Sequence, residues 1–216
     1  MSRITAIAVL PRRDGRFRLD VDGAAKAVVD AELVLDLQLT VGVAFDTDLA
    51  SRVEAGAARL AAFDKGMAAL AIRARSEGEL SRWLAQKGHA PEHVAAALER
   101  LGALGFLNDA AFARSFVRSR AVGRGMSRRR IQAELSRRGV ARELVDAAVS
   151  EVMEDEGIDE RALVEAAARK KMRTLARCEP DVQIRRLYGY LARRGFAAGL
   201  VHDVVRRVTM ARERPG

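Results

Sequence analysis

The chain has 216 residues, of which 49% are hydrophobic, 5% aromatic and 31% charged, and its formal net charge at pH 7 is +9. A core with so few aromatic residues has to be built from small aliphatic side chains, which favours closely packed helices over a sandwich of β-sheets. The single cysteine, Cys178, excludes an intramolecular disulfide framework, and no apolar run reaches the roughly 18 residues of a membrane span, so we expect a soluble, cytoplasmic protein.

Residues 1–55 are predicted to form a small β-rich region. In RFRLDVD (residues 16–22), apolar and charged residues alternate with the period of a half-buried strand. The segment ITAIAVL and the turn dipeptide Asp14-Gly15 precede it, which together indicate a β-hairpin. AKAVV is a candidate third strand, and periodicity leaves ELVLDLQL open between strand and short helix. Such a region is too small to be stable unless it docks on its neighbour.

From about Asp48 onward the pattern is helical, and one phrase occurs three times, aligned on Gly88, Gly139 and Gly195. Apolar residues recur eight and four positions before each glycine, and again six positions after it, on one face of each of two helices. A glycine between two helices suits a left-handed C-cap, and the Lys or Arg before it complements the helix C-terminus. The equivalent apolar residues are Leu80, Ile131 and Leu187, then Leu84, Leu135 and Leu191, then Val94, Val145 and Val201.

A further helix precedes each helical pair. Residues 57–75 form the first, and Ser76 with Glu79 then makes a capping box for the next helix. Asn108 or Asp109 is expected to cap the second of these preceding helices, with Phe112 and Phe116 assigned to the core together with Phe106. Asp159 is expected to cap the third.

The expected fold is therefore mainly α, with three tandem three-helix repeats that form an elongated curved body behind the β-rich region. The predicted domains are 1–55, 56–105, 106–156 and 157–216.

Three motifs resemble those of the RecX family, regulatory proteins of the bacterial recombinase RecA. They are Arg73-Ala74-Arg75-Ser76 with Glu79-Leu80, then GFLNDAAFA (105–113), then RIQAELSRRGV (130–140). The resemblance covers residues 60–152 well and the third repeat more weakly, where Gly199 replaces an acidic residue. It implies a protein that binds RecA filaments on single-stranded DNA and restrains the recombinase, ATPase and coprotease activities of RecA. We expect the protein to be a monomer.

The excess positive charge lies in one stretch. Ten arginines and one acidic residue, Glu134, lie between Ala110 and Arg142, and the rest of the chain holds equal numbers of basic and acidic residues. Because arginine binds phosphate and carboxylate groups well, this stretch predicts a contact surface for an acidic partner, although a solvated basic face stays open. The candidate contact residues are Arg114, Arg118, Arg124, Arg128, Arg129, Arg130, Arg137 and Arg138.

No catalytic constellation is found, so we expect neither an enzyme nor a cofactor. His89 and His93 are four residues apart but have Pro91 between them and lack further ligands, and Cys178 lacks a supporting His or Asp arrangement. GRGMSRRR (residues 123–130) contains glycines and basic residues but lies between helices, unlike a phosphate-binding loop. Trp83 and Tyr190 are expected at the edge of the core, where contact with a partner stays open.

Two functions remain. The first is the regulation of RecA, and the alternative is a basic helical-repeat module that binds single- or double-stranded DNA directly. They differ in whether the isolated protein binds DNA tightly at physiological salt or only when a filament is present.

Overall fold

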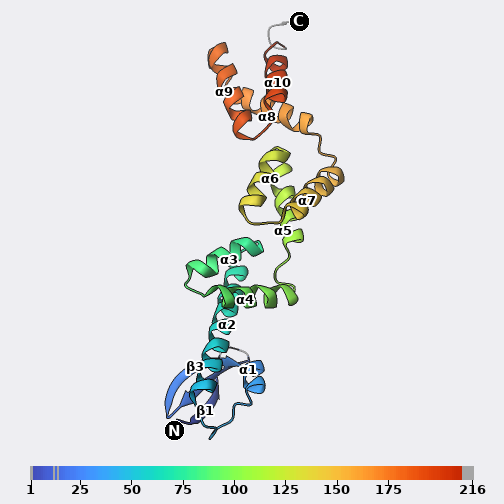
Figure 1. Ribbon diagram of the computed structural model, residues 1–216. Helices are drawn as coiled ribbons and strands as arrows, with labels where there is room; N and C mark the ends of the chain where they lie inside the picture. The colour runs from blue at the N-terminus through green and yellow to red at the C-terminus, as the bar shows by residue number, and fades with distance from the viewer. Residues whose placement is uncertain (1, 12, 14, 211–216) are drawn as a thin grey trace. The chain divides into compact units, whose positions relative to one another are not determined.

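The computed structural model describes residues 2–11, 13 and 15–210 of the chain, and this part is mostly helical with a small N-terminal sheet (Figure 1). The chain divides between Leu107 and Asn108 into two compact units. The first unit holds the sheet and one three-helix domain, and the second holds two further three-helix domains. The predicted fold class is confirmed in these elements.

The sheet has three antiparallel strands in the order β1-β2-β3. The predicted hairpin is β1 (Ile4–Val9) with β2 (Arg16–Val21), and the candidate third strand is present as β3 (Ala24–Asp30). Gly15 has a φ of 68°, as the expected turn requires, while Asp14 lies outside the described residues. Leu19 and Val29 are fully buried, and they anchor the face of the sheet that packs inward.

The ambiguous segment after the sheet is a helix, α1 (Ala31–Asp36). The Asp30 carboxylate accepts a hydrogen bond of 3.0 Å from the Leu33 N–H and caps this helix, a local interaction that decides between strand and helix. Leu33 then packs against the next helix at Gly56, where an added Cβ would lie 2.5 Å from both Leu33 methyl carbons. The glycine therefore allows α1 to lie close against that helix.

The helix expected over residues 57–75 is longer than predicted at its start and shorter at its end. It is α2 (Thr47–Ile72), and it begins early because the Asp46 carboxylate accepts from the Leu49 N–H at 2.8 Å. Its first half packs on the sheet region and its second half belongs to the first helical domain. The Arg16–Asp64 ion pair, at 2.6 Å, further ties β2 to this helix.

The three helical domains share one plan. The first joins the second half of α2 to α3 (Glu77–Gln86) and α4 (Pro91–Ala103). The second consists of α5 (Asp109–Ala121), α6 (Arg128–Arg137) and α7 (Arg142–Asp155). The third consists of α8 (Glu160–Thr174), α9 (Pro180–Arg193) and α10 (Ala198–Met210).

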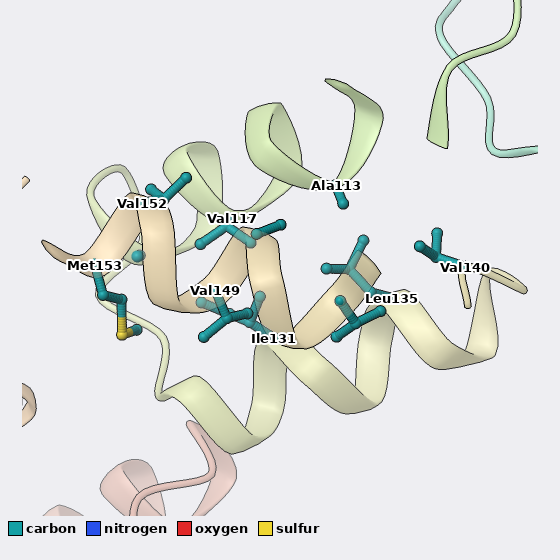
Figure 2. Close-up of a cluster of buried hydrophobic side chains, with 11 residues drawn as sticks. Ala113, Val117, Ile131, Leu135, Val140, Val149, Val152 and Met153 are labelled. Atoms are coloured by element: carbon teal, nitrogen blue, oxygen red, sulfur yellow. The ribbon is translucent and has the colours of Figure 1, made fainter. Parts of the chain in front are cut away.

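The repeat predicted from the glycines is confirmed. Gly88, Gly139 and Gly195 have φ values of 88°, 83° and 83°, the left-handed conformation that ends α3, α6 and α9. The apolar residues eight and four positions before each glycine are all 0% exposed, so they have equivalent environments in the three domains. Figure 2 shows the core of the second domain, where Ile131 and Leu135 of α6 meet residues of α5 and α7.

The assignment of the phenylalanines to the core is wrong in part. Phe106 is 52% exposed, and Phe112 and Phe116 are only partly buried beside the core, with their rings stacked 6.2 Å apart. The buried face of α5 instead carries Ala113, Val117 and Ala121, all 0% exposed. Small side chains at this spacing let α5 approach α7 closely, so the large rings are displaced to the flank.

Candidate functional site

The basic stretch folds into α5, a connection over residues 122–127, and α6. The Ser127 side chain is buried and caps α6 by accepting a hydrogen bond of 3.2 Å from the Arg130 N–H. Three arginines follow, Arg128, Arg129 and Arg130, and they fill the first turn of the helix. Positive charge at a helix N-terminus opposes the helix dipole, so these arginines do not serve the stability of α6.

In the other two domains, the first turn of the corresponding helix contains acidic residues, as the helix dipole favours. The first turn of α3 contains Glu77 and Glu79, and the first turn of α9 contains Asp181, whereas the first turn of α6 contains no acidic residue. The basic start of α6 is therefore particular to the second domain. It combines guanidinium groups with the positive end of a helix, an arrangement that favours an anionic partner.

Two of the candidate arginines have acidic partners that lie outside the basic stretch of the sequence. Arg114 lies 3.6 Å from Glu151, and Arg118 lies 2.6 Å from Glu156. Both pairs join α5 to the end of α7, and the hydrogen bond to Glu156 raises the pKa of Arg118 above its ordinary value. Acidic residues are scarce along this stretch of the sequence, but acids from a later segment lie beside it in the folded structure. These two arginines therefore have a structural role.

Three more candidate arginines are held by contacts within the second unit. Arg130 donates to the Glu134 carboxylate at 3.0 Å and to the Arg193 carbonyl oxygen at 3.1 Å. Arg137 donates to the Ala133 carbonyl oxygen at 3.1 Å, and the Arg138 guanidinium lies 4.9 Å from the centre of the Phe116 ring. Partial exposure of Phe116 thus gives the ring a cation-binding role beside the core.

The remaining three candidates, Arg124, Arg128 and Arg129, are exposed. Across the described part of the chain, their guanidinium groups make neither an ion pair nor a side-chain hydrogen bond. They lie within six residues of one another in the connection and the first turn of α6. The eight candidates thus reduce to a group of three unpaired arginines, which we call the free arginine cluster.

The structure adds contacts from the third domain that the sequence did not single out. Arg194, the C-cap of α9, donates from Nη1 to the carbonyl oxygens of Arg124 and Gly125. The repeat in the sequence could have indicated Arg194, because Arg193-Arg194 occupies the same positions in the third repeat as Arg137-Arg138 in the second.

Trp83, Glu134 and Tyr190, at one equivalent position, all receive cations at the edge of their cores. The Trp83 ring lies beside Arg75 and Lys87, at 5.2 and 5.7 Å, and the Tyr190 ring lies beside Arg194 and Lys171, at 4.7 and 5.5 Å. For each ring, one of the two cations is the basic residue that precedes the turn glycine, Lys87 or Arg194. The aromatic rings therefore have an internal role as supports for basic side chains.

Within residues 2–11, 13 and 15–210, no helix is both long enough and apolar enough to cross a membrane. The same residues contain no group of three or more His, Cys, Asp or Glu side chains that could hold a metal ion.

Family models match all three helical domains in order. They are the first, second and third three-helix domains of RecX, which match residues 62–101, 108–149 and 159–205. The regulatory protein RecX of Amycolatopsis mediterranei is 36% identical over 137 residues, which cover 63% of this chain and 77% of that protein. The protein of the same name from Mycolicibacterium vanbaalenii is 38% identical over 145 residues, which cover 63% and 76%.

Solved structures agree with the fold. A crystal structure of regulatory protein RecX superimposes with a TM-score of 0.74 and 19% identity, over 94% of this chain and 98% of that one. A crystal structure of RecX from Lactobacillus salivarius gives a TM-score of 0.57 and 14% identity, over 71% and 97%. At these identities the likeness concerns the fold alone.

Proposed function

The chain belongs to the RecX family, and we propose that it binds RecA and the filaments that RecA forms on single-stranded DNA. By this binding it modulates, and mostly inhibits, the recombinase, ATPase and coprotease activities of RecA. The proposal rests on the family for the identity of the partner and on the second helical domain for the chemistry of contact.

The observation that carries the contact is the free arginine cluster. The guanidinium groups of Arg124, Arg128 and Arg129 have no ion pair or hydrogen bond in the described part of the chain, although the chain pairs many other arginines with acids. Leaving three like charges within six residues of one another without counterions is unfavourable unless a ligand supplies the negative charge. A nucleoprotein filament offers two such ligands, the phosphates of its DNA and acidic side chains on its protein surface.

The same cluster supports an alternative function, in which the protein binds DNA directly and needs no RecA. Unpaired arginines bind phosphates in a sequence-independent and salt-dependent manner. Tight binding of the isolated protein to single-stranded DNA at physiological salt would favour this alternative. Binding that requires a preformed filament would favour the regulator.

The test is the ATPase activity of RecA on single-stranded DNA with the protein titrated in. We expect the parent protein to inhibit and the Arg128→Glu, Arg129→Glu double variant to lose inhibition. The fold should survive, because exposed charges without partners contribute little to stability. Matching circular dichroism spectra and melting temperatures check this point.

A matched control separates the position of the charge from its amount. Arg173 and Arg177 are also exposed and also lack an ion pair in the described residues, but they lie in the last turn of α8 and in the connection after it. Reversing both changes the net charge by the same amount, and we expect inhibition to persist. Full inhibition by the Arg128→Glu, Arg129→Glu variant would show that the contact surface lies elsewhere.

A further inference from the structure

The second and third helical domains meet through a polar junction at the free arginine cluster. The Ser127 N–H donates to the Arg194 carbonyl oxygen at 3.3 Å, and Arg130 donates to the Arg193 carbonyl oxygen at 3.1 Å. In the other direction, Arg194 donates to the carbonyl oxygens of Arg124 and Gly125. The C-terminal end of α9 thus docks onto the N-terminal end of α6, and their dipoles attract each other.

Gly195 allows the backbones of the two domains to approach each other closely at this junction. A Cβ at Gly195 would lie 2.7 Å from the Arg130 Cβ and 2.8 Å from the Ser127 Oγ, distances at which the backbones would have to separate. At Gly88, the equivalent turn of the first domain, the same addition would meet nothing within 4 Å. The glycine at 195 is therefore needed for its small size as well as for its φ value.

The junction is not supported by a shared apolar core. The buried residues of the second domain and those of the third form separate hydrophobic clusters in the described part of the chain. The junction is held by hydrogen bonds, and each of these contributes little net free energy because water offers the same groups alternative partners. Because so few polar contacts hold the junction, a small change in free energy is enough to shift the equilibrium between the docked and undocked arrangements of the two domains.

Docking also concentrates positive charge. It brings Arg193 and Arg194 of the third domain to the chain segment that carries Arg124, Arg128 and Arg129. Glu134, the acidic residue of the wider stretch from Ala110 to Arg142, is already shared by Arg120 and Arg130. Mutual repulsion of the arginines therefore opposes docking, and a polyanion that binds the cluster removes this opposition.

We infer that the third helical domain completes the anion-binding surface of the second, so that docking at the Ser127–Arg194 junction and binding of a single-stranded DNA backbone reinforce each other. Arg194 is a positioning residue in this scheme, because it holds the connection that carries Arg124. The coupling is reciprocal: DNA favours the docked arrangement as much as docking favours DNA. The inference rests on the proposed function for the choice of ligand.

The first test uses a variant that changes no charge. Gly195→Ala should weaken binding of a fluorescein-labelled oligothymidylate to the full-length chain by about tenfold, a typical size for such coupling. Gly88→Ala introduces the same backbone strain without a close contact, so it should bind as the parent does. Arg194→Lys keeps the charge but has a shorter side chain and loses the planar guanidinium that lies 4.7 Å from the Tyr190 ring, so it should weaken binding in the same direction as Gly195→Ala.

The second test measures docking itself. Spin labels at Ser136→Cys and Thr174→Cys, in a Cys178→Ser background, report the distance between the two domains. In the parent, the distance distribution should narrow when the oligothymidylate is added. It should also narrow when salt is raised without DNA, because salt screens the repulsion. Gly195→Ala should stay broad under both conditions.

The outcomes separate this inference from the proposed function. Parent-like DNA affinity and parent-like distances in Gly195→Ala would overturn the inference and leave RecA inhibition by the free arginine cluster standing. The inference would also be overturned if the distance distribution in the parent changed neither with salt nor with DNA. Loss of inhibition in Arg128→Glu, Arg129→Glu together with normal behaviour of Gly195→Ala would therefore keep the proposed function and reject the coupling.

Discussion

The free arginine cluster predicts a specific dependence of DNA binding on salt. Each phosphate neutralised on single-stranded DNA contributes about −0.7 to the slope of log affinity against log salt. Three unpaired arginines therefore predict a slope of about −2, which is roughly a 20-fold loss of affinity between about 50 and 200 mM salt. Replacing Arg128 and Arg129 with alanine should leave a slope of about −0.7 and only about a threefold loss over the same range.

The assay is fluorescence anisotropy of a labelled oligothymidylate at a series of salt concentrations, with a parent-like melting temperature as the control for folding. Arg114→Ala should change the slope little, because the partner of Arg114 is Glu151 rather than a phosphate. The double variant Arg173→Ala, Arg177→Ala should also keep the parent slope. An unchanged slope in Arg128→Ala, Arg129→Ala would refute the assignment of these side chains to phosphate.

Two further predictions concern stability. Leu135→Ala should lower the free energy of unfolding by about 2–5 kcal/mol in urea titrations. Phe116→Ala should lower it by less, because Leu135 is 0% exposed and Phe116 only flanks the core. An equal loss in the two variants would contradict this order. Burial acts to raise the pKa of Asp30, but hydrogen bonds from the Leu33 N–H and Arg100 outweigh it and hold that pKa below its usual value. The stabilisation is present above about pH 4 and is lost as the pH falls, so melts of Asp30→Asn should show a weaker loss of stability with acid than the parent.

The repeat could be predicted from the sequence because its signals are local. The three- and four-residue spacing of leucines and valines reports the face of a helix, and a glycine at its end reports a left-handed cap. Neither signal depends on residues far along the chain. The three buried pairs Leu80 and Leu84, Ile131 and Leu135, and Leu187 and Leu191 follow from this pattern alone.

The burial of Phe112 and Phe116 was mispredicted because the size of a side chain does not determine its depth. The helical face that points inward is set by how closely two helices approach, and Ala113, Val117 and Ala121 permit a closer approach than phenylalanines would. The apolar pattern of α5 contains both faces, one of small and one of large residues. Choosing between them requires the position of α7, which no local pattern supplies.

The roles of the arginines could likewise be predicted only where they depend on contacts that are local in the sequence. Arg114 and Arg118 are neutralised by Glu151 of α7 and by its C-cap Glu156, which lie much later in the chain, so a count of charges along a sequence window overstates the free positive charge. The contact of Arg194 with the connection after α5 also joins distant segments. Both facts depend on tertiary packing, and both lie beyond any reading of spacing.

The first turn of α6 is the exception, because there the helix rule alone distinguishes paired from unpaired arginines. Residues four apart on a helix are neighbours, and Arg130 has Glu134 at that distance, to which it donates at 3.0 Å. The residues four positions after Arg128 and Arg129 are a glutamine and an alanine, which offer no counterion. Three consecutive arginines therefore divide into one that is paired within the helix and two that remain available, and the reversal of these two tests the proposed function.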